Sequence, residues 1–169
     1  MNSSAPLPAA EPEDAESQFN LGLRFADGNG ETADYAEALK WYVKAAGQGH
    51  CVAQYHLGLM YGRGQGAQRD NATAGMWLRK AAELGHAGAQ YHVGLRQHRA
   101  SKSGQPPEAS ECRIEAFKWL QLAMGQGGRE AESAREFVAL GMTREEVDEA
   151  GRRATAFAAS GAQPNPVGG

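Results

Sequence analysis

The sequence predicts an all-α fold, a solenoid of antiparallel helix pairs, because two blocks of residues recur with a period of 36. The first block appears as QFNLGLRF at 18–25, QYHLGLMY at 54–61 and QYHVGLRQ at 90–97. The second appears as ALKWYVKAAGQGH at 38–50, AGMWLRKAAELGH at 74–86 and AFKWLQLAMGQGG at 116–128. Periods of about 20 to 50 residues are typical of arrays in which each unit buries its apolar face against its neighbours. We therefore expect three full repeats, each made of two helices.

The first helix of each unit is predicted to be apolar on two opposing sides. One stripe joins Leu21 to Phe25, and the second joins Phe19 to Leu23, two residues out of step, or about 200° around a helix. Such a helix is either buried between layers or buried on one side and open to a partner on the other. A glycine in the middle of each helix costs about 1 kcal/mol relative to alanine, so we expect the companion helix to approach closely there. These glycines are Gly22, Gly58 and Gly94.

The second helix of each unit carries a tryptophan among alanines on one face, with spacings of three and four residues. In the first unit this face consists of Ala38, Trp41, Tyr42 and Ala45, and the next two units repeat it. Asp34 and Asp70 precede these helices, where a carboxylate accepts from the first free amides. Glycines that follow the last periodic residue predict left-handed turns at the helix ends. They are Gly49, Gly85 and Gly127.

The third unit departs from the pattern. Trp77 and Trp119 are 42 residues apart, which places a six-residue insertion in the loop RASKSGQPPEAS at 99–110. Cys112 stands where the other units have a capping aspartate, so we expect Ser110 or Glu111 to cap this helix. The insertion at 96–110 also gathers basic residues, which form either a solvated loop, the reading that we favour, or a recognition element. These are Arg96, His98, Arg99 and Lys102.

A degenerate fourth pair of helices is predicted after Gly128. Residues 129–140 align with a first helix, and Thr143 with Glu146 forms a capping box ahead of a final helix with one polar side, as in a solenoid cap. We expect a repeat domain at 14–159, with units at 15–50, 51–86 and 87–128 and a capping pair at 129–159. The tails at 1–13 and 160–169 are rich in Pro, Ala, Gly and Ser, and we expect them to be disordered.

Composition and charge narrow the range of functions. The 17 Lys+Arg and 20 Asp+Glu residues give a net charge of -3, which argues against nucleic-acid binding. The chain has no run of 18 apolar residues, so we expect no membrane span. Its N-terminus lacks the basic start and apolar core of a secretory signal, so we expect a cytoplasmic protein. Two cysteines 61 residues apart, Cys51 and Cys112, predict neither a disulfide framework nor a zinc site.

The sequence also offers no chemistry for catalysis. The five histidines fall into two groups, and within each group neighbouring histidines are six residues apart, about 240° around a helix. They therefore cannot chelate a metal as i, i+4 pairs do. They are His50, His56, His86, His92 and His98. No S-x-x-K, Walker or dinucleotide-binding motif occurs, and only Lys102-Ser103-Gly104 resembles the K-[ST]-G element of acyl-transfer enzymes. We expect no catalytic residue, no cofactor and no metal.

The repeated residues resemble a known family. The motif Ala-Gln-Tyr-x-Leu-Gly, followed by Tyr61, the loop glycines, Asp70, Trp77 and Gly85, is similar to the Sel-one-like repeat, a relative of the tetratricopeptide repeat. The resemblance covers residues 15–128. It implies a right-handed superhelix of antiparallel helix pairs that serves as a scaffold or adaptor for protein partners.

We therefore expect a non-enzymatic, monomeric module that binds a peptide or protein segment along the groove formed by the first helices. The candidate partner-binding residues are Phe19, Leu23, Asp27, Tyr55, Leu59, Arg63, Tyr91, Leu95 and Arg99. The aromatic residues of this stripe could equally belong to the core between units. Two other functions stay open, a self-assembling structural element and an unrecognised hydrolase-like or ligand-binding activity.

Overall fold

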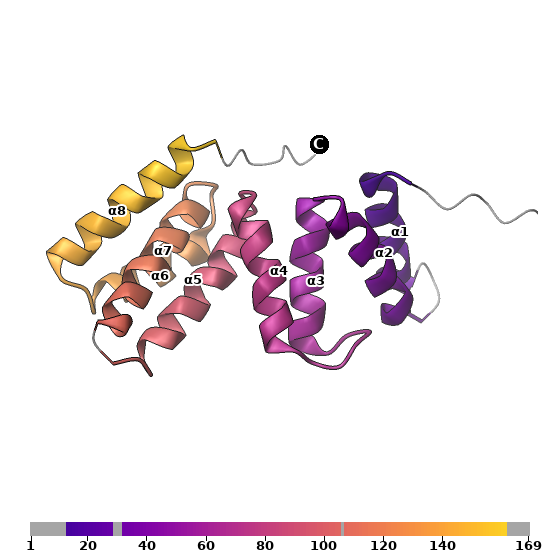
Figure 1. Cartoon of the computed structure of the whole chain (residues 1–169), viewed down its shortest axis with the longest axis horizontal. Helices are drawn as coiled ribbons and strands as arrows, with labels where there is room; N and C mark the ends of the chain where they lie inside the picture. Colours follow the sequence, from indigo (N-terminus) through magenta and orange to yellow (C-terminus); the bar gives the residue numbers. More distant parts are fainter. Residues whose placement is uncertain (1–12, 29–31, 106, 162–169) are drawn as a thin grey trace, which may run out of the picture.

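The computed structural model describes residues 13–28, 32–105 and 107–161, and this part of the chain is helical with no strand. The helices follow one another along the long axis of the molecule, from α1 and α2 at one end to α7 and α8 at the other (Figure 1). They are α1 (Ala15–Asp27), α2 (Tyr35–Gly47), α3 (Cys51–Arg63), α4 (Asn71–Glu83), α5 (Ala87–Ser101), α6 (Glu108–Met124), α7 (Arg129–Ala139) and α8 (Arg144–Ala159). Apart from residues 13, 160 and 161, the predicted tails lie outside the described residues.

Packing follows chain order, as it does in a solenoid. From α1 to α7 each helix packs on the next one along the chain, and α8 returns to pack on α6 beside α7. The predicted all-α solenoid of helix pairs is therefore confirmed. In the described ranges, no helix is both long enough and apolar enough to cross a membrane.

The predicted helix ends are found where the capping residues placed them. Asp34 accepts from the amide of Glu37 at 3.0 Å, and Asp70 accepts from the amide of Ala72 at 2.8 Å. Thr143 and Glu146 form the expected capping box at the start of α8. Positive φ angles of 87°, 91° and 89° occur at the three glycines that follow α2, α4 and α6. These glycines are Gly49, Gly85 and Gly127.

The mid-helix glycines mark close contacts between the two helices of a unit, as expected. A Cβ atom at Gly58 would lie 2.6 Å from Cγ of Leu78, and one at Gly94 would lie 2.7 Å from Cγ of Leu120. At Gly22 the neighbour is the ring of Tyr42, also at 2.6 Å. These glycines lower the helix propensity, and the tight packing of the paired helices that they allow offsets this cost.

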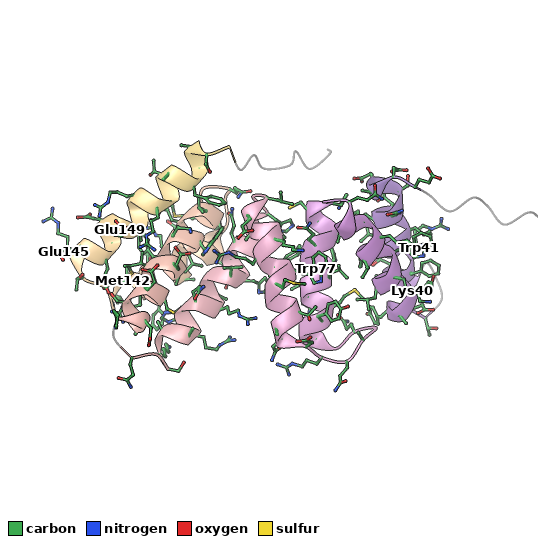
Figure 2. All side chains as sticks on the ribbon, viewed as in Figure 1. Lys40, Trp41, Trp77, Met142, Glu145 and Glu149 are labelled. Carbon is green, nitrogen blue, oxygen red and sulfur yellow. The ribbon has the colours of Figure 1, made fainter. Side chains whose placement is uncertain are left out.

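The core consists largely of alanines on the second helices and the large side chains that pack over them. Tyr42, Leu57, Trp119 and Leu120 are almost completely buried, and Trp41 is buried while Trp77 is half-buried. In Figure 2, Trp41 lies at the α1–α2 end and Trp77 near the middle of the molecule. The tryptophan face thus contributes to the packing in all three units, though least in the second.

Both ends of the predicted insertion loop, 99–101 and 108–110, are helical, which corrects the expectation of a loop over the whole of 99–110. α5 has 15 residues and α6 has 17, against 13 in each of the four helices before them, so most of the extra residues lengthen these two helices. Arg96, His98 and Arg99 lie on α5, and the His98 ring packs edge-on against Phe137 of α7.

The expected cap of α6 is also wrong. Pro107 occupies the N-cap position and offers no side-chain hydrogen bond. Ser110 and Glu111 lie inside the first turn, where Ser110 donates to Glu146 and Glu111 accepts from Arg153 of α8. Both side chains therefore hold the capping helix instead of the end of their own helix.

Candidate protein-binding groove

Two adjoining hollows run along the first helices and form what we call the groove. The smaller, the α1–α3 hollow, has a volume of about 240 Å³, and the larger, the α3–α5 hollow, has a volume of about 600 Å³. Leu59 and Arg63 of α3 line both hollows and so connect them. Leu23 and Asp27 of α1 line the α1–α3 hollow, and Leu95 and Arg99 of α5 line the α3–α5 hollow.

The repeat explains why these six side chains share one surface. Within each helix the leucine and the charged residue are four apart, so they lie on the same face. The same pair recurs every 36 residues, which places it at the same position of each successive first helix. The structure thus brings together six of the nine residues that the sequence nominated.

The three aromatic candidates are not equivalent to these six. Phe19 is only 8% exposed and belongs to the core around α1, α2 and α3, so it is removed from the groove wall. Tyr55 is half-buried and packs on the cluster of α4, α5 and α6, and Tyr91 is half-buried against the cluster formed by α6, α7 and α8. Their rings fill space between units, and none of the three lines either hollow.

Two histidines have a structural role that the sequence analysis missed. His50 and His86 are the N-caps of α3 and α5, where Nδ1 accepts from the amides of Ala53 at 3.1 Å and Ala89 at 3.2 Å. A polar residue directly before a helical block, at the same place in two repeats, was the available signal.

The other repeated histidines lie beside the groove. His56 lines the α1–α3 hollow and His92 the α3–α5 hollow. Burial lowers the pKa of His92, and the positive charge of Arg63 lowers it further. Burial likewise lowers the pKa of His56. Both rings therefore favour the neutral form, and the positive charge of the groove comes from arginine.

Four arginines surround the α3–α5 hollow, and no carboxylate belongs to its described lining. Arg63 and Arg99 were predicted as groove residues. Arg96 was named only among the basic residues of the insertion, and Arg69, which lies in the α3–α4 loop, was not named. Arg96 donates to the backbone carbonyl of Asn71 at 2.7 Å. Gly75 makes this path possible, since a Cβ there would lie 2.2 Å from a guanidinium nitrogen of Arg96.

The family can now be assigned. Three segments of the chain, 15–50, 51–86 and 87–127, match the Sel1 repeat. The chain belongs to the Sel1 repeat family. Sel1 repeat proteins are generally protein-interaction scaffolds and are typically non-enzymatic. The comparison with curated proteins finds no match.

Solved Sel1-like structures show the same fold. The c5321 protein, a protective antigen present in uropathogenic Escherichia coli strains, aligns with a TM-score of 0.72 at 24% identity. That alignment covers 88% of this chain but only 31% of the antigen, so the chain spans about a third of its length. A Sel1 repeat protein from Oxalobacter formigenes aligns with a TM-score of 0.62 at 30% identity, over 73% of this chain and 89% of the other.

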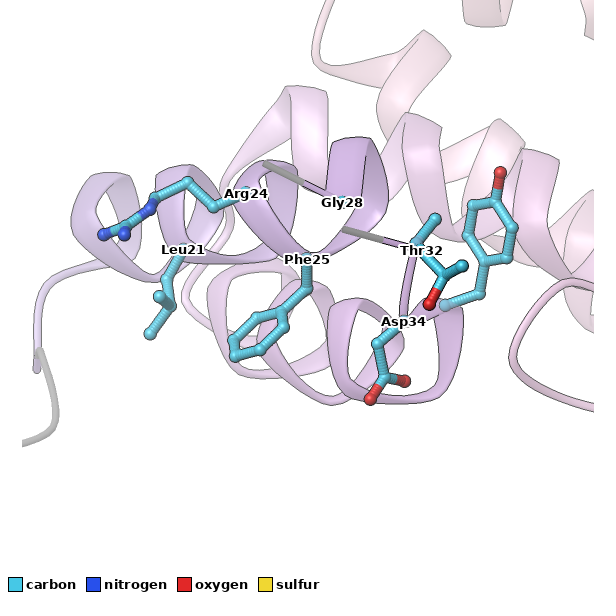
Figure 3. A pocket seen from close by; sticks show the side chains of 8 residues that line it. Leu21, Arg24, Phe25, Gly28, Thr32 and Asp34 are labelled. Atoms are coloured by element: carbon cyan, nitrogen blue, oxygen red, sulfur yellow. The ribbon is translucent and has the colours of Figure 1, made fainter. Parts of the chain in front are cut away.

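A further hollow of about 710 Å³ lies at the α1–α2 end of this Sel1 repeat domain (Figure 3). Leu21 and Phe25 line it, and they are the repeat equivalents of Leu57 and Tyr61, of which Leu57 is completely buried against the first unit. The hollow is thus the face that a preceding unit would cover. Two of its lining residues, Gly28 and Thr32, flank in the sequence a segment outside the described residues, so we place the candidate site in the groove.

The described residues of this Sel1 repeat protein give little support for a metal site or a reactive cysteine. No group of three or more metal-binding side chains occurs within the described ranges. Cys51 is buried and its Sγ donates to the carbonyl of Ala81 at 3.5 Å. Burial raises the pKa of this thiol, which favours the unreactive protonated form.

Proposed function

We propose that this chain is a scaffold that holds an extended segment of a partner protein in the groove between α1, α3 and α5. The observation that carries the proposal is the shared position of Leu59 and Arg63, which join two hollows into one path across three repeats. An extended segment suits such a path because successive side chains can meet successive repeats.

The groove offers both parts of a peptide-binding surface. Leu59 and Leu95 remain half-buried, so a partner side chain that covers them gains hydrophobic contact. Arg63 and Arg99 are exposed, and neither forms an ion pair with any residue that the structure describes. Unpaired cations beside apolar contacts supply orientation and specificity, as in other concave binding sites.

Selection from a random peptide library displayed on phage tests this proposal. Peptides enriched on the wild-type chain should bind Leu59→Gln at least tenfold more weakly in fluorescence anisotropy, since the substitution adds a polar group to the floor shared by both hollows. Leu140→Gln is the matched control, because Leu140 is 85% exposed on the distant cap and should leave affinity unchanged. Failure to enrich any peptide, or equal loss in both folded variants, would contradict the proposal.

Self-assembly is a second candidate that one observation favours. Phe137 and Leu140 are large apolar side chains on or beside α7, and they are 59% and 85% exposed. A second copy of the chain that covered them would give a dimer at the capping end. Sedimentation equilibrium should then show a dimer that Leu140→Gln dissociates, whereas a monomer at high concentration excludes it.

A further inference from the structure

The charge of the α3–α5 hollow opposes that of the whole chain. The protein carries a net charge of -3, yet this hollow is lined by four arginines and by no described carboxylate. Asp70, the nearest acidic residue in the sequence, has its oxygens occupied by the amides of Ala72 and Thr73 and by the Thr73 hydroxyl. None of the four arginines forms an ion pair with a residue that the structure describes. Asp27 is an acidic residue of the groove, but it lines the adjoining α1–α3 hollow.

Two of the arginines are brought together by a single residue. The Arg96 guanidinium donates to the Asn71 backbone carbonyl at 2.7 Å, and Arg69 Nε donates to the Asn71 side-chain oxygen at 3.4 Å. Arg96 comes from α5 and Arg69 from the α3–α4 loop, so two separate elements each bring a guanidinium to Asn71 in the lining of the hollow. Each guanidinium has five N–H donors, and these contacts use only one of each. The remaining donors are available to a carboxylate.

The two other arginines extend the positive charge along the groove. Arg63 and Arg99 occupy equivalent positions of α3 and α5, and both are exposed. The leucines Leu59 and Leu95 lie one helical turn before them. The leucines thus form one row and the arginines a parallel row, and both rows run in the direction in which the repeats succeed one another.

From this arrangement we propose that the segment bound in the groove is acidic. Its carboxylates would pair with Arg69 and Arg96 at one point and with Arg63 and Arg99 along the rim, while aliphatic side chains between them cover Leu59 and Leu95. Arginine favours such pairing because its planar guanidinium binds a carboxylate through two parallel hydrogen bonds. This inference rests on the proposed function and specifies the chemistry of the partner.

The lining favours a protein over a single-stranded nucleic acid. Nucleic-acid grooves combine arginines with aromatic platforms on which successive bases stack. The α3–α5 hollow has no Tyr, Phe or Trp among its described lining residues, and Tyr55 is already stacked on His86. Leucines and carboxylate-binding arginines suit an acidic, aliphatic peptide.

The peptides enriched in the library selection provide the first test. They should contain more aspartate and glutamate than the unselected library. A synthetic peptide of glutamate, leucine and glycine should then bind the wild-type chain, and its matched peptide with glutamine for glutamate should bind at least tenfold more weakly. Raising the salt concentration should weaken the binding of the acidic peptide and leave the binding of the neutral peptide almost unchanged.

Charge-removing variants locate the effect. Arg63→Gln/Arg99→Gln and Arg69→Gln/Arg96→Gln should each lower affinity for the glutamate peptide by about tenfold or more. Arg144→Gln removes the same kind of charge from the start of α8, outside the groove, and should change affinity less than twofold. Circular dichroism and thermal melting establish beforehand that each variant is folded.

The outcomes separate this inference from the proposed function. Enriched peptides that depend on Leu59 but are neutral or basic would overturn the acidic partner and leave the groove in place. Peptides that ignore both Leu59 and the four arginines would overturn both proposals. A polyuridylate strand that displaces the glutamate peptide and binds more tightly, with the same dependence on the arginines, would reassign the hollow to nucleic acid.

Discussion

The imidazole of His86 stacks on the ring of Tyr55, with the ring centroids 4.2 Å apart and the planes 22° apart. The same imidazole caps α5 through Nδ1, so it joins the second unit to the third. One period earlier, His50 stacks on Phe19 at 4.6 Å and caps α3. At each of these two junctions, one histidine thus makes contacts with both units.

This double role predicts a graded response to substitution. His86→Asn keeps a capping side chain and loses the stacked ring, so it should destabilise the fold by about 0.5–1.5 kcal/mol. His86→Ala loses both and should cost about 1 kcal/mol more. Urea unfolding followed by circular dichroism measures both values. Equal stability of the two variants would show that the cap contributes nothing.

Close packing at the mid-helix glycines predicts that alanine is harmful there. Gly58→Ala gains up to about 1 kcal/mol of helix propensity, but its Cβ would lie 2.6 Å from Leu78 Cγ and 3.2 Å from the Ala74 carbonyl oxygen. Neither neighbour can move easily, so we expect a net destabilisation of about 1–3 kcal/mol.

Gly151 of α8 provides the matched control for this experiment. It has no atom within 4 Å of a built Cβ, so Gly151→Ala should stabilise the chain by about 0.5–1 kcal/mol. Thermal melting of the two variants side by side decides the point. A stabilised Gly58→Ala would mean that the paired helices are farther apart than the structure shows.

The buried histidines predict a loss of stability as the solution becomes mildly acidic. Burial lowers the pKa of His56, His86 and His92 below the ordinary value of 6.5. The unfolded chain therefore binds more protons than the folded chain as pH falls through about 6.5, and the free energy of unfolding decreases until the folded pKa values are reached. At pH values above this window the histidines are neutral in both states and the stability is fully present.

Urea unfolding at a series of pH values from about 7.5 to about 5.5 measures this slope. The variant His56→Gln/His92→Gln should show a shallower decrease, because two of the titrating groups are gone. Burial also lowers the pKa of His86 and His98, so these two residues retain part of the decrease in stability. A slope that the double variant leaves unchanged would mean that other groups control the acid sensitivity.

The cap of the solenoid depends on Glu146. This carboxylate accepts from the Thr143 amide at 2.8 Å, from Arg113 at 2.8 Å and from Ser110, so it ties α8 to α6. Burial alone would raise the pKa of Glu146, but the hydrogen bonds from Ser110 and Arg113 outweigh it and hold the pKa below its ordinary value. Glu146→Gln should therefore destabilise the fold by about 1–3 kcal/mol.

Its neighbour Glu145 is the control for this substitution. Glu145 is exposed at the outer end of α8 (Figure 2), and Glu145→Gln should change stability by less than about 0.5 kcal/mol. Chemical unfolding of both variants at neutral pH is sufficient. If both lose the same amount, the effect comes from the charge at the helix start and not from the bonds to α6.

The sequence predicted those features that depend on local chemistry repeated in register. Asp34 and Asp70 cap their helices through amides two or three residues further along the chain. Gly22, Gly58 and Gly94 face the companion helix of their own unit, and their recurrence in every repeat made this close packing predictable. The groove leucines and charges were also predictable, since a fixed period places equivalent residues on one surface.

Features that depend on contacts between distant residues were not predictable. Phe19 looked like Tyr55 and Tyr91 in the sequence, but burial in the first unit removes it from the surface. Arg69 and Arg96 entered the site because Asn71 and Gly75 of a neighbouring helix receive them, which no spacing within one helix reveals. The insertion lengthened α5 and α6, and the contact of His98 with Phe137 of α7 joins residues that are 39 positions apart in the sequence.

Heteronuclear NMR of the isotope-labelled chain tests directly whether an acidic segment binds in the groove, with the glutamate, leucine and glycine peptide as the probe. We predict amide shift changes confined to α3, α5 and the α3–α4 loop, with the largest at Leu59, Arg63, Leu95 and Arg99. Arg63→Gln/Arg99→Gln should abolish them at the same peptide concentration. Shift changes centred instead on the exposed residues Val43 and Met76 of the second helices, or none at all, would contradict an acidic segment bound in the groove.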